Sequence, residues 1–248
     1  MSVSFDRVAE SFDRTRRFPA FVTDKIVQTF VRELEGYSNI LDVAVGTGRF
    51  AKPLQDVGYE IVGIDISAKM LKEARKKGTR GLIEGDACCL PFPESAFDAA
   101  ISVGTLHLIT DWRLALREIT RVTRRSLFTV LREGPYYSLT PSGKYKELLK
   151  RYGVSYTHPG VGLWKLKETL TPTRSTLAAS YEVSASEKIA FLAEKAFSYQ
   201  WNVPDGLHRK AMRELKRMFS KGQTYSCDVY VHEWDVNAVR DGFPRPTT

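Results

Sequence analysis

A short apolar run leads directly into a glycine-rich turn at Ile40-Leu41-Asp42-Val43-Ala44-Val45-Gly46-Thr47-Gly48-Arg49-Phe50. A strand that enters a glycine loop lets backbone amides approach a ligand that side chains would otherwise block. Asp65 ends the next apolar run roughly 20 residues later, where an acid can accept both ribose hydroxyls of a nucleoside. The spacing therefore predicts a nucleoside site in an α/β domain.

The residues around the loop indicate which nucleoside binds. The loop lacks the third glycine of the G-x-G-x-x-G pattern typical of dinucleotide sites. Asp42, four residues before Gly46, would repel a pyrophosphate but suits the ammonium of a methionine moiety. Asp86 follows the third strand, where its carboxylate or the Ala87 amide can contact an adenine edge. These acids favour a positively charged sulfonium nucleoside over NAD.

Strand and helix patterns alternate outward from the loop, which predicts a doubly wound, mostly parallel α/β sheet covered on both faces. The last strand alternates imperfectly, as an antiparallel strand near the edge would. One predicted helix starts at Ser186, which can form a capping box with neighbouring acids. The predicted strands cover residues 40–45, 60–64, 81–84, 97–103, 126–131, 179–183 and 224–234. The predicted helices cover residues 49–57, 67–77, 111–122 and 204–219, and one that starts at Ser186.

The chain of 248 residues fits one domain in four parts. We expect an amino-terminal helical lid at 1–36 and a cofactor-binding core at 37–133. A small helical lobe inserted at 134–175 would bind the substrate, because proline dipeptides and aromatic residues interrupt the pattern there. The segment 176–248 would complete the core sheet.

Several motifs together resemble class I S-adenosylmethionine-dependent methyltransferases of the type 11 branch, which includes the ubiquinone and menaquinone C-methyltransferases. The matching segments are 40–50 (motif I), 62–67 (the ribose motif), 84–87 with 90–92 (the adenine stretch), 97–111 (the fourth-strand motif) and Phe12-Asp13-Arg14-Thr15-Arg16-Arg17-Phe18-Pro19 (the amino-terminal motif). The resemblance covers roughly residues 10–132. It implies S-adenosyl-L-methionine as cofactor, S-adenosyl-L-homocysteine as product, no metal, and a Rossmann-like seven-stranded fold.

This sequence departs from the family pattern at four places. Ala44 replaces the first loop glycine, which is tolerable if its φ stays negative, and Val45 replaces a small residue or cysteine. Phe12 stands where a tyrosine is common, and His107-Leu108 where many relatives have two histidines.

The resemblance implies specific site residues. Arg16 is expected to hold the methionine carboxylate, or else to be a solvated arginine. His107 at the carboxyl edge of the sheet is a candidate general base, or else packs beside the cofactor, and Tyr136 is a second candidate base. The expected cofactor contacts are Arg16, Asp42, Ala44, Gly46, Gly48, Asp65, Ile66, Met70, Asp86, Ala87 and Val103. The expected substrate pocket consists of Phe12, Phe18, Tyr136, Tyr137 and Trp164.

Composition leaves the acceptor open. The chain is 43% hydrophobic and 27% charged, with a net charge of +8 that is compatible with RNA or protein acceptors but is also typical of solvated helix faces. A small-molecule acceptor is the first hypothesis, and a non-catalytic, cofactor-binding regulatory protein is a further alternative. The three cysteines form no disulfide or zinc pattern, and neither a signal peptide nor a membrane span is expected, which predicts a cytoplasmic protein.

Overall fold

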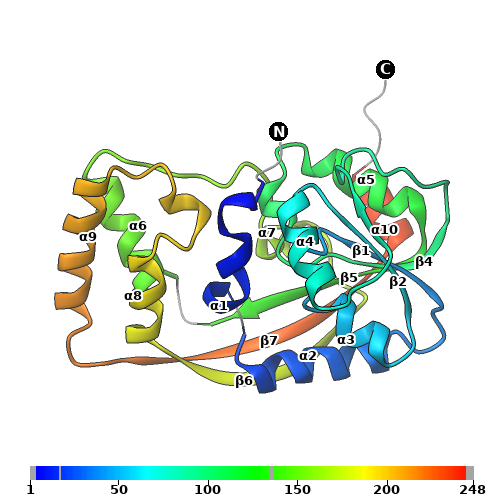
Figure 1. Cartoon of the computed structure of the whole chain (residues 1–248), viewed down its shortest axis with the longest axis horizontal. Helices are drawn as coiled ribbons and strands as arrows, with labels where there is room; N and C mark the ends of the chain where they lie inside the picture. The colour runs from blue at the N-terminus through cyan, green and yellow to red at the C-terminus, as the bar shows by residue number, and fades with distance from the viewer. Residues whose placement is uncertain (1–3, 17, 135–136, 244–248) are drawn as a thin grey trace.

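One seven-stranded sheet organises the molecule, with strand order β3-β2-β1-β4-β5-β7-β6. The computed structural model describes residues 4–16, 18–134 and 137–243. Its strands are β1 (Asn39–Val43), β2 (Glu60–Asp65), β3 (Leu82–Glu84), β4 (Phe97–Ile101), β5 (Thr123–Glu133), β6 (Arg174–Ser184) and β7 (Thr224–Asp235). Figure 1 shows the long strands β5, β6 and β7 extending well beyond the short central strands.

Strand direction follows the prediction. The pairs among β1 to β5 are parallel, and β7 is antiparallel to both β5 and β6. The strand β7 lies inside the sheet rather than at its edge, because β6 pairs with its outer side. β1 is buried on both faces after its first residue, as expected for a central parallel strand.

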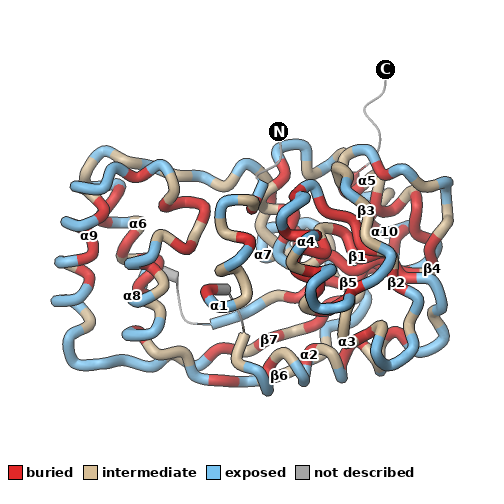
Figure 2. Tube along the Cα trace, in the orientation of Figure 1, coloured by how far each residue is buried: buried red, intermediate tan, exposed pale blue. Residues whose placement is uncertain are grey.

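Helices cover both faces of this sheet. One face is covered by α2 (Ala20–Glu33), α3 (Ala51–Asp56) and α4 (Ala68–Lys76). The other is covered by α5 (Trp112–Val122), α7 (Leu163–Thr169) and α10 (Val236–Gly242). Figure 2 shows the resulting buried centre as a red band through β1, β2 and β5.

The helix α2 belongs to this core, so the expectation of a lid over residues 1–36 is wrong for its second half. Val22, Ile26 and Phe30 are fully buried in the cluster beneath the sheet. Their i, i+4 spacing places them on one helix face, and burial of that face fixes the helix against the strands. The elements before α2, η1 (Asp6–Ser11) and α1 (Phe12–Arg16), lie on the side of the glycine loop.

A separate hydrophobic cluster lies outside the sheet, beside the ends of β5, β6 and β7 at the left of Figure 1. It joins α6 (Pro141–Arg151), α8 (Ala185–Ala193) and α9 (Asp205–Met218), with η3 (Tyr137–Leu139) and η4 (Ser198–Gln200) beside them. The helical lobe thus draws on two connections, one on each side of β6. The segment 134–175 supplies only part of it, and α7 from that segment packs on the sheet instead.

Two local expectations differ from the structure. β5 and β6 are longer than predicted: β5 also includes 123–125 and 132–133, and β6 also includes 174–178, which extends its pairing with β7, and Ser184. The cap of α8 is Ser184, whose side chain accepts a hydrogen bond from the Ser186 amide, and not Ser186 itself. No helix of the described ranges is both long and apolar enough to cross a membrane.

Candidate functional site

The turn after β1 has an unusual backbone. Ala44 has φ +60°, Gly46 +57° and Gly48 +71°. The condition under which alanine would be tolerated here, a negative φ, is therefore not met. The Val45 amide donates to the Ile64 carbonyl at 3.0 Å, and this bond to the neighbouring strand holds the turn in its left-handed conformation. Only glycine adopts that conformation without a steric cost, so Ala44 is strained.

Two close contacts explain residues around this turn. Gly63 in β2 has no room for a side chain because Val45 lies 2.8 Å from the position of a β-carbon there. The valine that departs from the family pattern is thus accommodated by the glycine opposite. At Gly48 a β-carbon would lie 2.3 Å from Thr79 Oγ1, so Gly48 packs the loop against the chain before β3.

A cavity of about 470 Å³ opens at the carboxyl ends of the parallel strands. That size suits a small-molecule ligand. Among the residues expected to contact the cofactor, nine line it: Asp42, Ala44, Gly46, Asp65, Ile66, Met70, Asp86, Ala87 and Val103. Gly48 does not line it, and the Arg16 side chain lies outside the described structure.

The Asp42 carboxylate is the unusual group in this cavity. Its residue is 4% exposed, and no described residue donates a hydrogen bond to it. Burial, followed by the nearby charge of Asp65, raises the pKa of Asp42 to about 7. A buried carboxylate without a donor is unfavourable unless a cation or donor from a ligand completes it.

Asp65 is held by the backbone. The amide of Gly46 donates to Oδ2 and the amide of Ser67 to Oδ1, each at 2.9 Å. Burial raises the pKa of Asp65, and these amide donors partly oppose that rise. Asp86 Oδ1 accepts from the Cys88 amide, so this acid caps its own turn while lining the cavity. Burial and Asp86 raise the pKa of the Cys88 thiol to about 11, which is unfavourable for a nucleophile.

The amino-terminal segment closes one side of the cavity through Asp13. Its Oδ1 accepts from Thr47 Oγ1 at 2.7 Å and from Arg49 Nη2 at 3.1 Å, and its Oδ2 from Lys77. These bonds lower the pKa of Asp13 against the effect of its burial. Asp6 similarly accepts from the Ser67 hydroxyl beside the Asp65 loop. The segment is thus tied to both cofactor loops.

His107 lies in η2 (Leu106–Leu108) and lines the cavity. Its ring meets that of His158 edge to face, with centroids 4.7 Å apart. The Gly160 amide donates to the His107 carbonyl, and a β-carbon at Gly160 would lie only 2.0 Å from the Leu106 carbonyl oxygen. A close backbone approach at Gly160 therefore brings His158 beside His107.

The residues expected to form the substrate pocket do not all line the cavity. Phe12 and Phe18 line the cavity. Trp164 does not: it is 63% exposed on α7, because Leu166 of that helix turns toward the core and Trp164 away from it. Tyr136 and the side chain of Tyr137 lie outside the described residues.

Several residues that line the cavity were not predicted as site residues, among them Phe5, Arg49 and Arg132. Arg49 directly follows Gly48 of the glycine loop, and that position could have indicated that it lines the site. Arg132 shares its β5 face with Val130 at the carboxyl end of that strand, so strand alternation could have found it. Phe5 belongs to a segment with no strand or loop pattern.

Comparison with known proteins agrees with this geometry. A methyltransferase domain model of the type 11 family matches residues 41–128. The chain is 29% identical to a demethylmenaquinone methyltransferase of Paenarthrobacter aurescens, over 78% of this chain and 70% of that protein. A protein of the same name from Thermotoga maritima is 39% identical over 49% of this chain and 56% of its own length. Residues 41–128 therefore have the sequence pattern of a type 11 methyltransferase domain.

Solved structures share the fold of this methyltransferase domain. A putative methyltransferase of an antibiotic biosynthesis pathway from Anabaena variabilis has a TM-score of 0.57 at 16% identity, and covers 84% of this chain and 96% of its own. An S-adenosylmethionine-dependent methyltransferase of Thermotoga maritima, titled a possible histamine N-methyltransferase, has a TM-score of 0.51 at 19% identity, with 92% and 97% coverage. Further curated demethylmenaquinone methyltransferases that the chain matches are likewise covered over only about half of their own length.

Proposed function

We propose that this chain transfers the methyl group of S-adenosyl-L-methionine to a small-molecule acceptor. The observation that carries the proposal is the buried Asp42 carboxylate, which faces the cavity without a donor. A methionine ammonium would supply the missing partner. Asp65, with its carboxylate oriented by two amides, would accept the ribose hydroxyls, and Asp86 with Ala87 would contact the adenine.

The chemistry requires little from the protein. When bound, S-adenosylmethionine would supply an electrophilic methyl group on its sulfonium. Positioning and exclusion of water by the apolar walls can supply most of the acceleration. Phe12 and Phe18 are part of those walls. His107 is the candidate to take a proton from an acidic acceptor.

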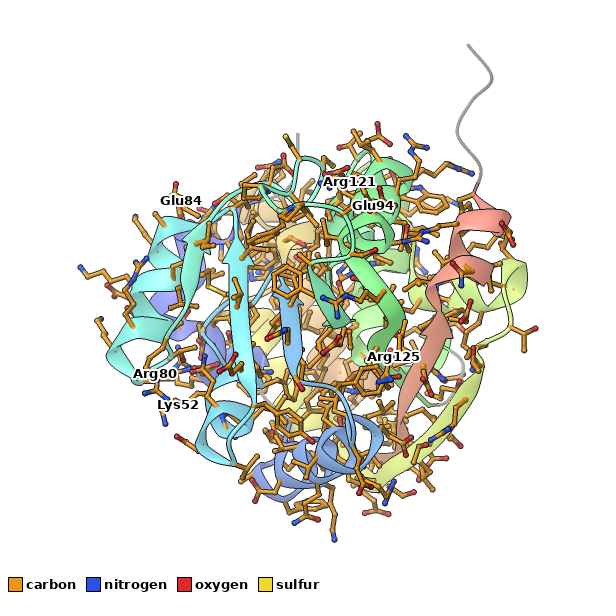
Figure 3. All side chains as sticks on the ribbon, turned by 90° about the vertical axis from the view of Figure 1, so that its right-hand side faces the viewer. Lys52, Arg80, Glu84, Glu94, Arg121 and Arg125 are labelled. Carbon is orange, nitrogen blue, oxygen red and sulfur yellow. The ribbon has the colours of Figure 1, made fainter. Side chains whose placement is uncertain are left out.

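The basic surface favours no macromolecular acceptor. An RNA acceptor would favour basic side chains at the cavity mouth, but Lys144, Lys150 and Arg151 of α6 do not line the cavity. Figure 3 shows positive side chains such as Lys52, Arg80 and Arg121 spread over different elements around the sheet, with Glu84 and Glu94 among them. The names of the curated relatives also support a small acceptor.

Calorimetry with S-adenosylmethionine, S-adenosylhomocysteine and NAD tests the proposal. We expect both sulfur nucleosides to bind and NAD to bind weakly or not at all. Asp65→Ala should weaken binding by about 1–3 kcal/mol through lost charge-assisted bonds. Asp56→Ala, which changes an exposed acid of α3, is the control and should leave binding unchanged.

The outcomes separate the alternatives. If neither sulfur nucleoside binds, the proposed function is wrong, and tight NAD binding would favour an oxidoreductase. Tight nucleoside binding with no turnover on a panel of phenols, amines and carboxylic acids would favour the non-catalytic alternative.

A further inference from the structure

Arg132 brings a positive charge into the cavity at the end of β5. Phe128, Val130 and Arg132 alternate along one face of the strand, and the first two are buried in the cluster under the sheet. Two residues beyond Val130, the strand passes the edge of that cluster. Arg132 is exposed there, and it lines the cavity together with Val130.

Aromatic rings rather than an acid hold the Arg132 side chain. Its guanidinium carbon lies 4.9 Å from the ring centroid of Phe18 and 5.6 Å from that of Tyr181. Through the described part of the chain, no carboxylate pairs with it, and the neighbouring Glu133 binds Lys167 instead. Other arginines do have acids, as Arg14 has Glu194 and Arg124 has Asp98.

The next positive group toward the cofactor loop is Arg49. Its own acid is Asp13, and burial together with the charge of Arg132 lowers the pKa of Arg49. Arg132 therefore adds a charge that the surrounding side chains do not neutralise. Cation–π contacts with the two rings hold the guanidinium beside the cavity.

The cavity has charges of opposite sign at its two ends. Asp42 and Asp65 end β1 and β2, while Arg132 ends β5, which is separated from β1 by β4. Apolar side chains lie between these ends, among them Val103, Leu108 and Ile109. A nucleoside on the acidic end would leave the apolar walls and the Arg132 end for the other reactant.

We propose that Arg132 binds a carboxylate on the methyl acceptor, which is an aromatic or similarly flat, apolar acid. The inference rests on the proposed function, because it assigns the acceptor end of the same cavity. The planar guanidinium matches a carboxylate through two parallel hydrogen bonds, and the apolar walls take the ring. A lysine at this position has no planar fork and does not reproduce the stacked geometry.

Binding to the complex with S-adenosylhomocysteine tests this assignment. The probes are 4-hydroxybenzoate and 2-naphthoate, each paired with its neutral carboxamide, and calorimetry measures all four. We expect each acid to bind about 10-fold or more tightly than its amide, as charge-assisted bidentate pairs are the strong ones. Arg132→Met should abolish this preference, and Arg132→Lys should retain only part of it.

The control is Arg125→Met. Arg125 is also on β5 and also stacks on a ring, with its guanidinium carbon 4.1 Å from the Tyr37 centroid, but it lies outside the cavity. It should leave the preference for acids unchanged. Thermal denaturation verifies that both variants fold.

Three results would overturn the assignment. The first is that neither acid binds better than its amide in the unchanged protein. The second is that the preference survives in Arg132→Met. The third is that Arg132→Met weakens S-adenosylhomocysteine itself more than about 10-fold, which would assign Arg132 to the methionine carboxylate of the cofactor. No binding of S-adenosylhomocysteine to the unchanged protein would overturn the proposed function as well.

Discussion

Ala44 carries backbone strain at the turn that faces the cavity. With φ at +60°, an L-residue there costs roughly 1–2 kcal/mol relative to its normal conformations, and glycine avoids that cost while losing about 0.4–1 kcal/mol through greater freedom when unfolded. Ala44→Gly should therefore raise the free energy of unfolding by about 0.5–1 kcal/mol in urea denaturation. Ala190→Gly, at an exposed position inside α8, is the control and should lower it by about 1 kcal/mol. Equal losses in both variants would show that the turn is not strained.

Asp42 makes the stability of the ligand-free protein depend on pH. Its pKa in the folded protein is about 7 against an ordinary 3.8, so the folded state holds more protons than the unfolded state between these values. The contribution of Asp42 to the free energy of unfolding therefore falls as pH rises from about 4 to about 7, and is constant above. Asp42→Asn removes this dependence.

Urea denaturation at about pH 5 and about pH 8 measures the effect. Relative to the unchanged protein, Asp42→Asn should be more stable at the higher pH than at the lower one. Saturating S-adenosylhomocysteine should reduce that advantage, because its ammonium would stabilise the ionised carboxylate. The same pH dependence in both proteins would contradict the buried, unpartnered state of Asp42.

Gly160 determines how the segment that carries His158 docks on η2. A β-carbon there would lie 2.0 Å from the carbonyl oxygen of Leu106 and 2.4 Å from that of Ile109, and backbone atoms cannot easily move aside. Gly160→Ala should lower the free energy of unfolding by about 1–3 kcal/mol, as overpacking does, and displace His158 from His107. Urea denaturation measures the first effect, and the imidazole NMR signals of His107 the second.

Gly206→Ala is the matched control for this substitution. Gly206 is in α9, and nothing lies within 4 Å of its added β-carbon, so the change should raise the free energy of unfolding by about 0.5 kcal/mol. If Gly160→Ala were also neutral or stabilising, the close contact with η2 would not exist in solution.

At the scale of helices and strands, the sequence predicted those elements whose apolar residues repeat with a clear local period. The central strands and α4, α5 and α9 match their expected ranges closely, because buried runs and caps such as Ser67 and Asp111 mark them. The position of α2 was not predicted. Its apolar face is as visible in the sequence as those of the other helices, but which surface it covers depends on contacts with strands such as β6, which is 141 residues away at Arg174 and Glu33.

The cofactor end of the site was more predictable than the acceptor end. Asp42, Asp65 and Asp86 each stand at a strand end, and parallel strands bring their carboxyl ends to one edge. The end of the cavity at Arg132 combines Phe18 and Arg132 from segments that share no local pattern. Trp164 illustrates the difficulty: an aromatic residue in an irregular segment faces solvent or cavity according to the helix that carries it.

In the whole molecule, the amino-terminal segment connects the cofactor loop to the helical lobe. Asp13 binds Thr47, Arg49 and Lys77 on the core side, and Arg14 binds Glu194 on the lobe side with two hydrogen bonds. The two sides differ in burial. The Arg49 side chain is 17% exposed, whereas those of Arg14 and Glu194 are 59% and 44% exposed. The contacts of Asp13 should therefore matter more than the bridge to the lobe, because exposed ion pairs contribute little.

Asp13→Asn tests this difference directly. It removes the carboxylate that Thr47, Arg49 and Lys77 share, and a largely buried charge such as that of Arg49 is destabilised when it loses an acidic partner. The segment should then release the glycine loop, and we expect S-adenosylhomocysteine to bind about 10-fold more weakly. Hydrogen exchange in residues 4–16 should become faster in the same variant.

Arg14→Ala, one residue along the same helix, should change the affinity by less than about threefold. If Arg14→Ala had the larger effect on affinity, closure of the cavity would depend on the helical lobe. The segment would then act as a bridge between the sheet and the lobe rather than as a cover fixed to the glycine loop.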